Sequence, residues 1–112
     1  MDSVVFNGVT ADVNPVIAAP GAGLSIAVWG LITSVDTGSD VTQFKDTDAS
    51  GTSRLLVRCT TQTTEIGGPV TQPSGDPLFR CAVNTALYMD KSTSNAQYGT
   101  LFYTIEGNGP ER

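Results

Sequence analysis

Apolar and polar residues alternate along most of this chain with the period of two that is typical of β-strands. The clearest run covers residues 24–35, LSIAVWGLITSV. Two groups within it each share one face, and Gly30 separates them: Leu24, Ile26 and Val28, then Leu31, Thr33 and Val35. Because a glycine at a change of phase is typical of a β-bulge, the pattern predicts a long strand with a bulge near Gly30.

Shorter alternating runs follow, separated by segments rich in Gly, Pro, Asp and Ser. They predict strands at residues 41–45, 54–62, 78–83, 85–92 and 98–106. Residues 84–98 are the one segment that could form a helix instead of a strand. The positions at helical spacing from Leu87 are polar, however, so this segment has no apolar helix face. We therefore expect an all-β protein: residues 24–106 should form a single compact antiparallel β-sandwich, jelly-roll-like in its connections.

The two ends of the chain lie outside this strand pattern. Residues 13–23, VNPVIAAPGAG, carry two prolines and two glycines among small residues, so we expect residues 1–23 to form an extended N-terminal arm. Residues 107–112, GNGPER, should form a polar tail. The apolar cluster Val4, Val5 and Phe6 has no obvious place in the sandwich. We predict that the arm carries this cluster onto a neighbouring subunit or onto the shell beneath it.

Composition excludes several classes of function. The net charge is −5, and two lysines and four arginines are too few for the basic face of a nucleic-acid binder. No apolar run approaches the ~18 residues of a membrane span, and the N-terminus has no signal-peptide pattern. Histidine is absent, which excludes His-based catalytic triads and zinc–His sites. We expect no enzymatic activity, cofactor, metal or small-molecule substrate.

Two cysteines fall on predicted inward faces. Cys59 alternates in phase with Leu55 and Val57, and Cys81 alternates in phase with Phe79 and Val83. Buried cysteine behaves as a small apolar residue. Free buried thiols are favoured over a disulfide because no secretion signal indicates an oxidising compartment, although the sequence leaves both open.

Residues 44–56, FKDTDASGTSRLL, resemble the start of a calcium loop. Asp46, Asp48 and Ser50 have the spacing of the first ligands, and Gly51 stands at the sixth position. The twelfth position, which needs a bidentate Glu, is Val57. A turn between two strands explains the same residues, with Gly51 supplying a positive φ. We favour the turn, with a weak calcium site near Asp46 and Asp48 as the alternative.

Aromatic residues are the remaining candidates for a binding surface: Trp29, Tyr88, Tyr98, Phe102 and Tyr103. They could stack on sugars, although at strand spacing cross-strand packing is the more usual role. Phe102 is the most informative, because it lies on the opposite face of its strand from Tyr103, which we expect in the core. Either both faces of this strand are covered, or Phe102 contacts another subunit.

Four segments in this order resemble a family of small bacteriophage virion proteins: AAPGAGLSIAVWGLIT, VTQFKDTDASGTSRL, TALYMDKSTS and YGTLFYTIE. The resemblance covers residues 18–106, and the two cysteines are not part of the family pattern. It implies a β-sandwich with a structural role, most simply a capsid decoration (cement) protein that binds the assembled shell and stabilises it.

Such proteins are typically trimers that sit over junctions between capsid subunits. The resemblance therefore implies a homotrimer in the virion, assembled in the bacterial cytoplasm, with the major capsid protein or another virion subunit as partner. The expected subunit or shell interface comprises Val4, Val5, Phe6 and Phe102. The alternative is a receptor-facing tail or fibre adhesion module that binds carbohydrate.

Overall fold

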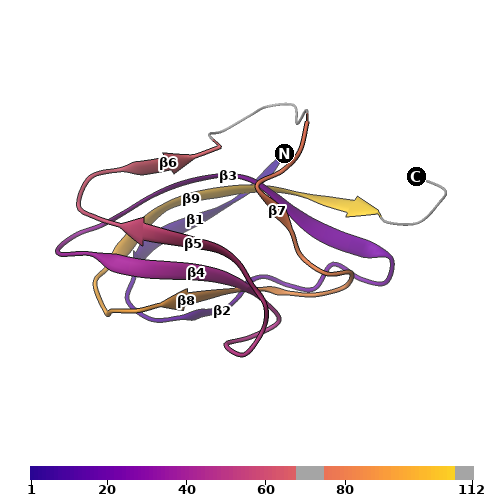
Figure 1. The fold of residues 1–112 in the computed structure, drawn as a ribbon, viewed down its shortest axis with the longest axis horizontal. Helices are drawn as coiled ribbons and strands as arrows, with labels where there is room; N and C mark the ends of the chain where they lie inside the picture. The colour runs from indigo at the N-terminus through magenta and orange to yellow at the C-terminus, as the bar shows by residue number, and fades with distance from the viewer. Residues whose placement is uncertain (68–74, 108–112) are drawn as a thin grey trace.

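A computed structural model describes residues 1–67 and 75–107, which form nine strands and no helix. The strands are β1 (Asp2–Val9), β2 (Val13–Ile17), β3 (Leu24–Val35), β4 (Asp40–Asp46), β5 (Ser53–Cys59), β6 (Thr64–Ile66), β7 (Phe79–Arg80), β8 (Leu87–Lys91) and β9 (Gln97–Gly107). Sheet A has the order β1-β9-β3-β6, with β7 also paired to β3, and sheet B has the order β2-β8-β4-β5 (Figure 1).

The predicted all-β antiparallel sandwich is confirmed. The bulge predicted in the longest strand is also present, because the register of β3 against β9 shifts between Val28 and Gly30. The first and last strands are neighbours in sheet A, and the second and second-last are neighbours in sheet B. This nested order is consistent with the jelly-roll-like connections that we expected. The polar tail at 108–112 lies outside the described residues.

A separate N-terminal arm is not confirmed, because its residues belong to both sheets. β1 pairs antiparallel with β9, and β2 pairs antiparallel with β8. The prolines and glycines that suggested an extended arm fall mostly after or beside these strands, and Pro15 is tolerated because β2 is an edge strand. The sequence pattern missed β1 because its pairing partner lies some ninety residues away along the chain.

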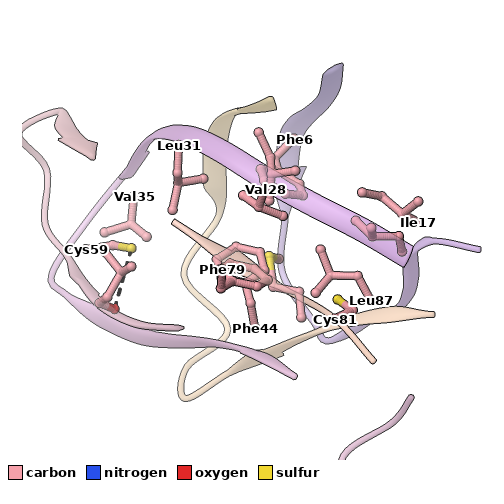
Figure 2. Packing of buried hydrophobic residues seen from close by; sticks show 14 residues of the cluster. Phe6, Ile17, Val28, Leu31, Val35, Phe44, Cys59, Phe79, Cys81 and Leu87 are labelled. Atoms are coloured by element: carbon pink, nitrogen blue, oxygen red, sulfur yellow. Dashed lines mark hydrogen bonds between the residues drawn. The ribbon is translucent and has the colours of Figure 1, made fainter. Parts of the chain in front are cut away.

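The core lies between the two sheets and is built by inward-facing residues of nearly every strand (Figure 2). Its fully covered large side chains include Ile26, Leu31, Phe44, Leu87, Met89 and Leu101. Both cysteines are free thiols and are buried, as favoured from the sequence. Burial, reinforced by the negative charge of Asp46, raises the pKa of the Cys81 thiol to about 12. This thiol is therefore protonated at neutral pH and is a poor nucleophile.

The segment that resembles a calcium loop is a turn between β4 and β5. Asp46 accepts a short hydrogen bond from Arg54 (2.6 Å) across the hairpin. Asp48 accepts hydrogen bonds from the amide and the hydroxyl of Ser50. Both carboxylates thus have protein partners, which for Asp46 bind Oδ2 and leave the buried Oδ1 without a hydrogen bond. The described residues contain no group of three or more His, Cys, Asp or Glu side chains that could hold a metal ion.

The role that we expected for Gly51 is wrong in one respect. The residue with positive φ in this turn is Thr47 (φ 70°), not Gly51. Gly51 is needed because a Cβ there would lie 1.6 Å from the carbonyl oxygen of Asp46. The constraint is therefore a close approach of two backbone segments and not a special backbone conformation.

We predict that Gly51→Ala lowers the free energy of unfolding by about 1–3 kcal/mol, because the turn must open to admit the methyl group. Urea denaturation followed by tryptophan fluorescence measures the change. The matched control is Ser50→Ala, which removes an exposed hydroxyl from the same turn and should change stability by less than about 0.5 kcal/mol. Equal stability of the two variants would contradict the steric explanation.

Candidate interaction surface

The apolar cluster near the N-terminus is divided between the two faces of β1. Phe6 is 3% exposed, faces the core and lies with its ring centroid 6.5 Å from that of Phe44. Val4, on the same face, is partly buried against the core. Val5 points the other way and is 68% exposed, the largest exposure among the large hydrophobic side chains described. Of the three expected interface residues, only Val5 is available at the surface.

β9 divides its side chains in the same way. Leu101 is fully buried, and Tyr103 packs partly buried against the core, as expected. Phe102 and Tyr98 lie on the opposite, outer face, where Phe102 is half-buried and Tyr98 is 42% exposed. Phe102 is therefore not covered fully by the residues that the structure describes.

The outer residues of neighbouring strands form one surface, which we call the outer patch: Val5, Ile32, Tyr98 and Phe102. The registers bring them together, because Thr100 of β9 lies between Val5 of β1 and Ile32 of β3. Phe102 lies two residues further along β9 on the same face, and Tyr98 lies two residues before. The outer patch thus consists of four apolar side chains around Thr100 of β9, with the edge strand β1 on one side and Glu65 of β6, opposite Ile32, on the other.

Two of the other aromatic residues have structural roles. Trp29 is 9% exposed and donates a hydrogen bond from Nε1 to Thr104 (2.8 Å). Tyr88 is 6% exposed and donates its hydroxyl to Asp12 (2.6 Å). That hydrogen bond, with burial and the charge of Asp12, raises the pKa of Tyr88 to about 12. Neither ring is free to stack on a sugar.

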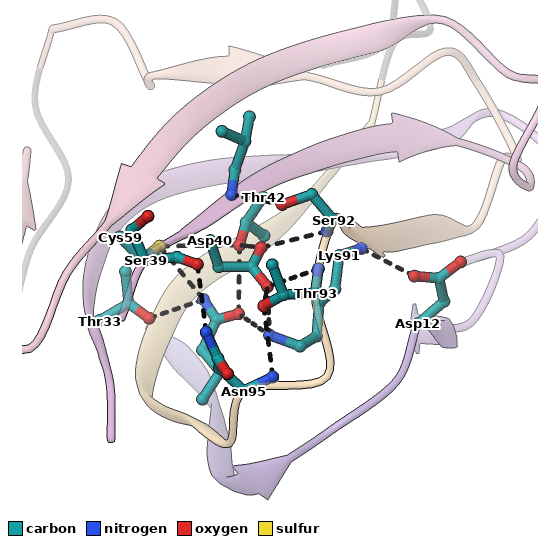
Figure 3. Close-up of polar contacts among 12 residues, drawn as sticks. Asp12, Thr33, Ser39, Asp40, Thr42, Cys59, Lys91, Ser92, Thr93 and Asn95 are labelled. Atoms are coloured by element: carbon teal, nitrogen blue, oxygen red, sulfur yellow. Dashed lines mark hydrogen bonds and ion pairs between the residues drawn. The ribbon is translucent and has the colours of Figure 1, made fainter. Parts of the chain in front are cut away.

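A second feature, a buried polar network, lies at the end of the sandwich where β4 and β9 begin and β8 ends (Figure 3). Lys91 donates to Asp40 (Nζ–Oδ2, 3.0 Å), and the two side chains are 1% and 0% exposed. Lys91 also donates to Oε1 of Gln97 (2.9 Å). Gln97 donates from Nε2 to Thr33 (2.8 Å) and lies 3.5 Å from the sulfur of Cys59. The network therefore joins sheet A to sheet B.

Asp40 is the most strongly bonded member of this network. Burial alone would raise its pKa, but hydrogen bonds from Thr93, Lys91, Ser92 and Thr42 outweigh burial and lower the pKa to about 2. The carboxylate is therefore ionised at neutral pH and compensates the charge of Lys91. The network stabilises the fold and leaves no unpaired group for acid–base chemistry.

Reasoning from the sequence missed this network, although the pattern contained a signal. Lys91 continues the inward phase of Leu87 and Met89. Asp40 likewise shares the inward phase of Phe44. Two opposite charges in phase with core residues indicate a buried pair, but only the pairing of β4 with β8 shows that they meet.

A shallow, open hollow adjoins the network on the surface. It is lined mainly by hydroxyl-bearing residues and one carboxylate: Thr10, Ala11, Asp12, Lys91, Ser92, Thr93 and Ser94. The carboxylate of Asp12 is engaged by Tyr88 and by the amide of Lys91. Since its charged groups are already bonded within the chain, the hollow has no charged group directed at a ligand.

Comparisons with protein-family models, with curated proteins and with solved structures find no match for this chain. Among the described residues, none belongs to a helix of the length and apolarity needed to cross a membrane.

We predict that acid destabilises the protein as the pH falls from about 4 towards 2. The folded-state pKa of Asp40 is below the ordinary value of 3.8, so its stabilisation is complete above that value and is lost as the carboxylate protonates. The pKa of Asp46 is also lowered: hydrogen bonds from Arg54 and the Ala82 amide outweigh the opposing effect of burial. Thermal unfolding between pH 2 and 7 measures this effect.

The matching variant is Asp40→Asn, which leaves the charge of Lys91 buried without a counter-charge. We expect a loss of about 3–5 kcal/mol at pH 7 and a flatter dependence on acid. The control is Asp90→Asn, which breaks the more exposed ion pair with Lys45 and should cost less than about 1 kcal/mol. If Asp40→Asn unfolds with the same pH profile as the unmodified chain, the network does not have this role.

Proposed function

We propose that this protein is a structural virion protein, a capsid decoration protein that binds the assembled shell of a bacteriophage and stabilises it. The observation that supports this most directly is the outer patch, where apolar side chains of three neighbouring strands lie exposed or half-buried on one sheet face. Exposed apolar groups gathered on one face are typical of protein contact sites. The resemblance of residues 18–106 to small virion proteins supports the same function.

The composition of the outer patch fits a protein partner. Aromatic side chains are enriched in the centres of interfaces, and charged residues are depleted there. The outer patch contains two aromatic and two aliphatic residues around Thr100, and the charge that adjoins it, Glu65, lies at its margin opposite Ile32. The major capsid protein, or another virion subunit, is the partner that this function requires. The homotrimer that the resemblance implies would present several copies of the outer patch together.

The alternative is a tail or fibre adhesion module that binds carbohydrate. Tyr98 favours it, because a ring that is 42% exposed can stack on a sugar. The internal hydrogen bonds of Trp29 and Tyr88 favour it less, since they reduce the aromatic surface available. Copy number separates the two functions. A decoration protein should be present at one copy per few shell proteins in purified particles, and a tail module at a handful per particle.

The residues of the outer patch provide the test of shell binding. Deleting residues 1–12, which an N-terminal arm would suggest, would remove a core side chain with β1, so point variants are the better choice. We predict that Phe102→Thr and Tyr98→Thr each weaken binding about tenfold or more, because each removes an aromatic contact. Co-sedimentation with shells of the encoding phage, assembled without this protein, measures the affinity.

The matched control is Leu56→Thr. Leu56 is 59% exposed and lies on β5 of sheet B, whereas the outer patch belongs to sheet A. Its binding should be unchanged. Thermal unfolding of all three variants shows whether the fold is intact. Undiminished shell binding by both outer-patch variants would overturn the proposed contact, and absence of binding by the unmodified protein would overturn the function.

A further inference from the structure

The outermost strands are β1, β6 and β7 in sheet A and β2 and β5 in sheet B, and they differ in how well their edges are protected against pairing. Proteins protect such edges with prolines, charged side chains, β-bulges or short length. β2 contains Pro15, and β6 and β7, which share one edge, have only three and two residues. β5 carries Arg54 and Arg58 on either side of its exposed Leu56. Three edges therefore carry features that oppose pairing with another strand.

β1 is the exception. It has eight residues and contains no proline, lysine or arginine, and its one charged residue, Asp2, stands at its start. Its register shifts only near its end, between Asn7 and Val9, so residues 2–7 form a regular strand. In the described part of the chain it pairs on one side only, with β9 (Figure 1). The backbone N–H and C=O groups on its other side are therefore free to pair with one more strand. Another extended strand is the partner whose own backbone groups can form hydrogen bonds with all of them, one after another.

We propose that the occupant of this edge is β1 of a second copy, paired antiparallel about a two-fold axis at Val5. Antiparallel partners that lie opposite one another point to the same face of a sheet. This register therefore places Val5 against Val5, Ser3 against Asn7 on the outer face, and Val4 against Phe6 on the inner face. Sheet A then continues from one copy into the other.

The side chains of β1 are complementary to themselves in this register. On the outer face the exposed Ser3 and Asn7 form a polar pair at each end, and the exposed Val5 residues form an apolar pair between them. On the inner face the partly buried Val4 gains cover next to Phe6, which extends the core across the two-fold axis.

Charge also permits this pairing. Asp2 lies opposite Gly8, so the two Asp2 residues stand at opposite ends of the paired segment, six residues or about 20 Å apart. That separation exceeds the screening length of about 10 Å at moderate salt. A strongly basic strand would have only one opposite charge to pair with on β1, that of Asp2. A strand with few charges fits better, and β1, whose one charged residue is Asp2, is such a strand.

The pairing does not require shell binding, but Val5 belongs to both surfaces, and pairing would join the outer patches of two copies into one surface. A two-fold contact of this kind closes with two copies. It is therefore an assembly different from the homotrimer that the resemblance implies, and its mass distinguishes it.

The register can be tested with single cysteines, because the native Cys59 and Cys81 are 0% and 5% exposed and should not react. We expect Val5→Cys to form a disulfide-linked dimer under mild oxidation. Ser3→Cys alone should not, since its two copies would lie about 14 Å apart. A mixture of Ser3→Cys and Asn7→Cys proteins should form the mixed dimer. Cross-linking of Ser3→Cys as efficient as that of Val5→Cys would overturn the register.

Sedimentation equilibrium in the absence of shells tests the pairing itself. The unmodified protein should be a dimer, and Val5→Lys should weaken dimerisation at least tenfold by placing two like charges opposite each other. Leu56→Lys on β5, another exposed position, is the control and should remain dimeric. Thermal unfolding checks that both variants fold. A monomer, or a trimer that Val5→Lys leaves intact, would overturn the proposal.

The outer-patch variants separate this inference from the proposed function, because Phe102 lies on β9 and not on the edge strand, whereas Val5 belongs to both surfaces. If Phe102→Thr remains a dimer and loses shell binding, pairing and shell contact are independent and both proposals stand. If the unmodified protein is a monomer and Phe102→Thr loses shell binding, pairing with a second copy is overturned and the proposed function stays in place.

Discussion

A buried polar network, centred on the ion pair that Lys91 and Asp40 form within sheet B, joins the two sheets at one end of the sandwich. Both side chains are almost fully excluded from water, so each requires the other. Gln97 extends the pair to sheet A through Thr33. Because apolar packing alone has little directional preference, these directional contacts fix where the start of β9 lies against β4 and β8. The fold thus has a polar anchor at one end and an apolar core along the rest.

The two cysteines, which the virion-family pattern does not explain, belong to polar sites within the interior. Cys59 lies 3.5 Å from Nε2 of Gln97 and 3.6 Å from the hydroxyl of Thr42. Cys81 lies near Asp46, whose charge contributes to its raised pKa. A thiol is small and only weakly polar, so it fills space beside a buried polar group at low cost. The cysteines are therefore best understood as packing residues.

β1 shows how one strand can contribute to the core and to the surface at once. Its inward residues join the apolar cluster, whereas its outward residues remain exposed beside Phe102 and Tyr98. A strand of period two has one face for each role. The cluster Val4, Val5 and Phe6, which the sequence suggested as a single interface, is therefore divided by geometry into two core residues and one surface residue.

The sequence pattern was sufficient to predict the all-β class, the bulge near Gly30, the inward phase of the cysteines and the placement of Phe102 and Tyr103 on opposite faces of one strand. These properties follow from local alternation, which the chain expresses within a few residues. The folded chain adds that residues 2–9 form a strand beside β9, that Lys91 contacts Asp40, and that a neighbouring carbonyl requires a glycine at position 51. Those features depend on contacts between residues distant in sequence, or on the path of the backbone through a turn, and side-chain periodicity contains no information about either.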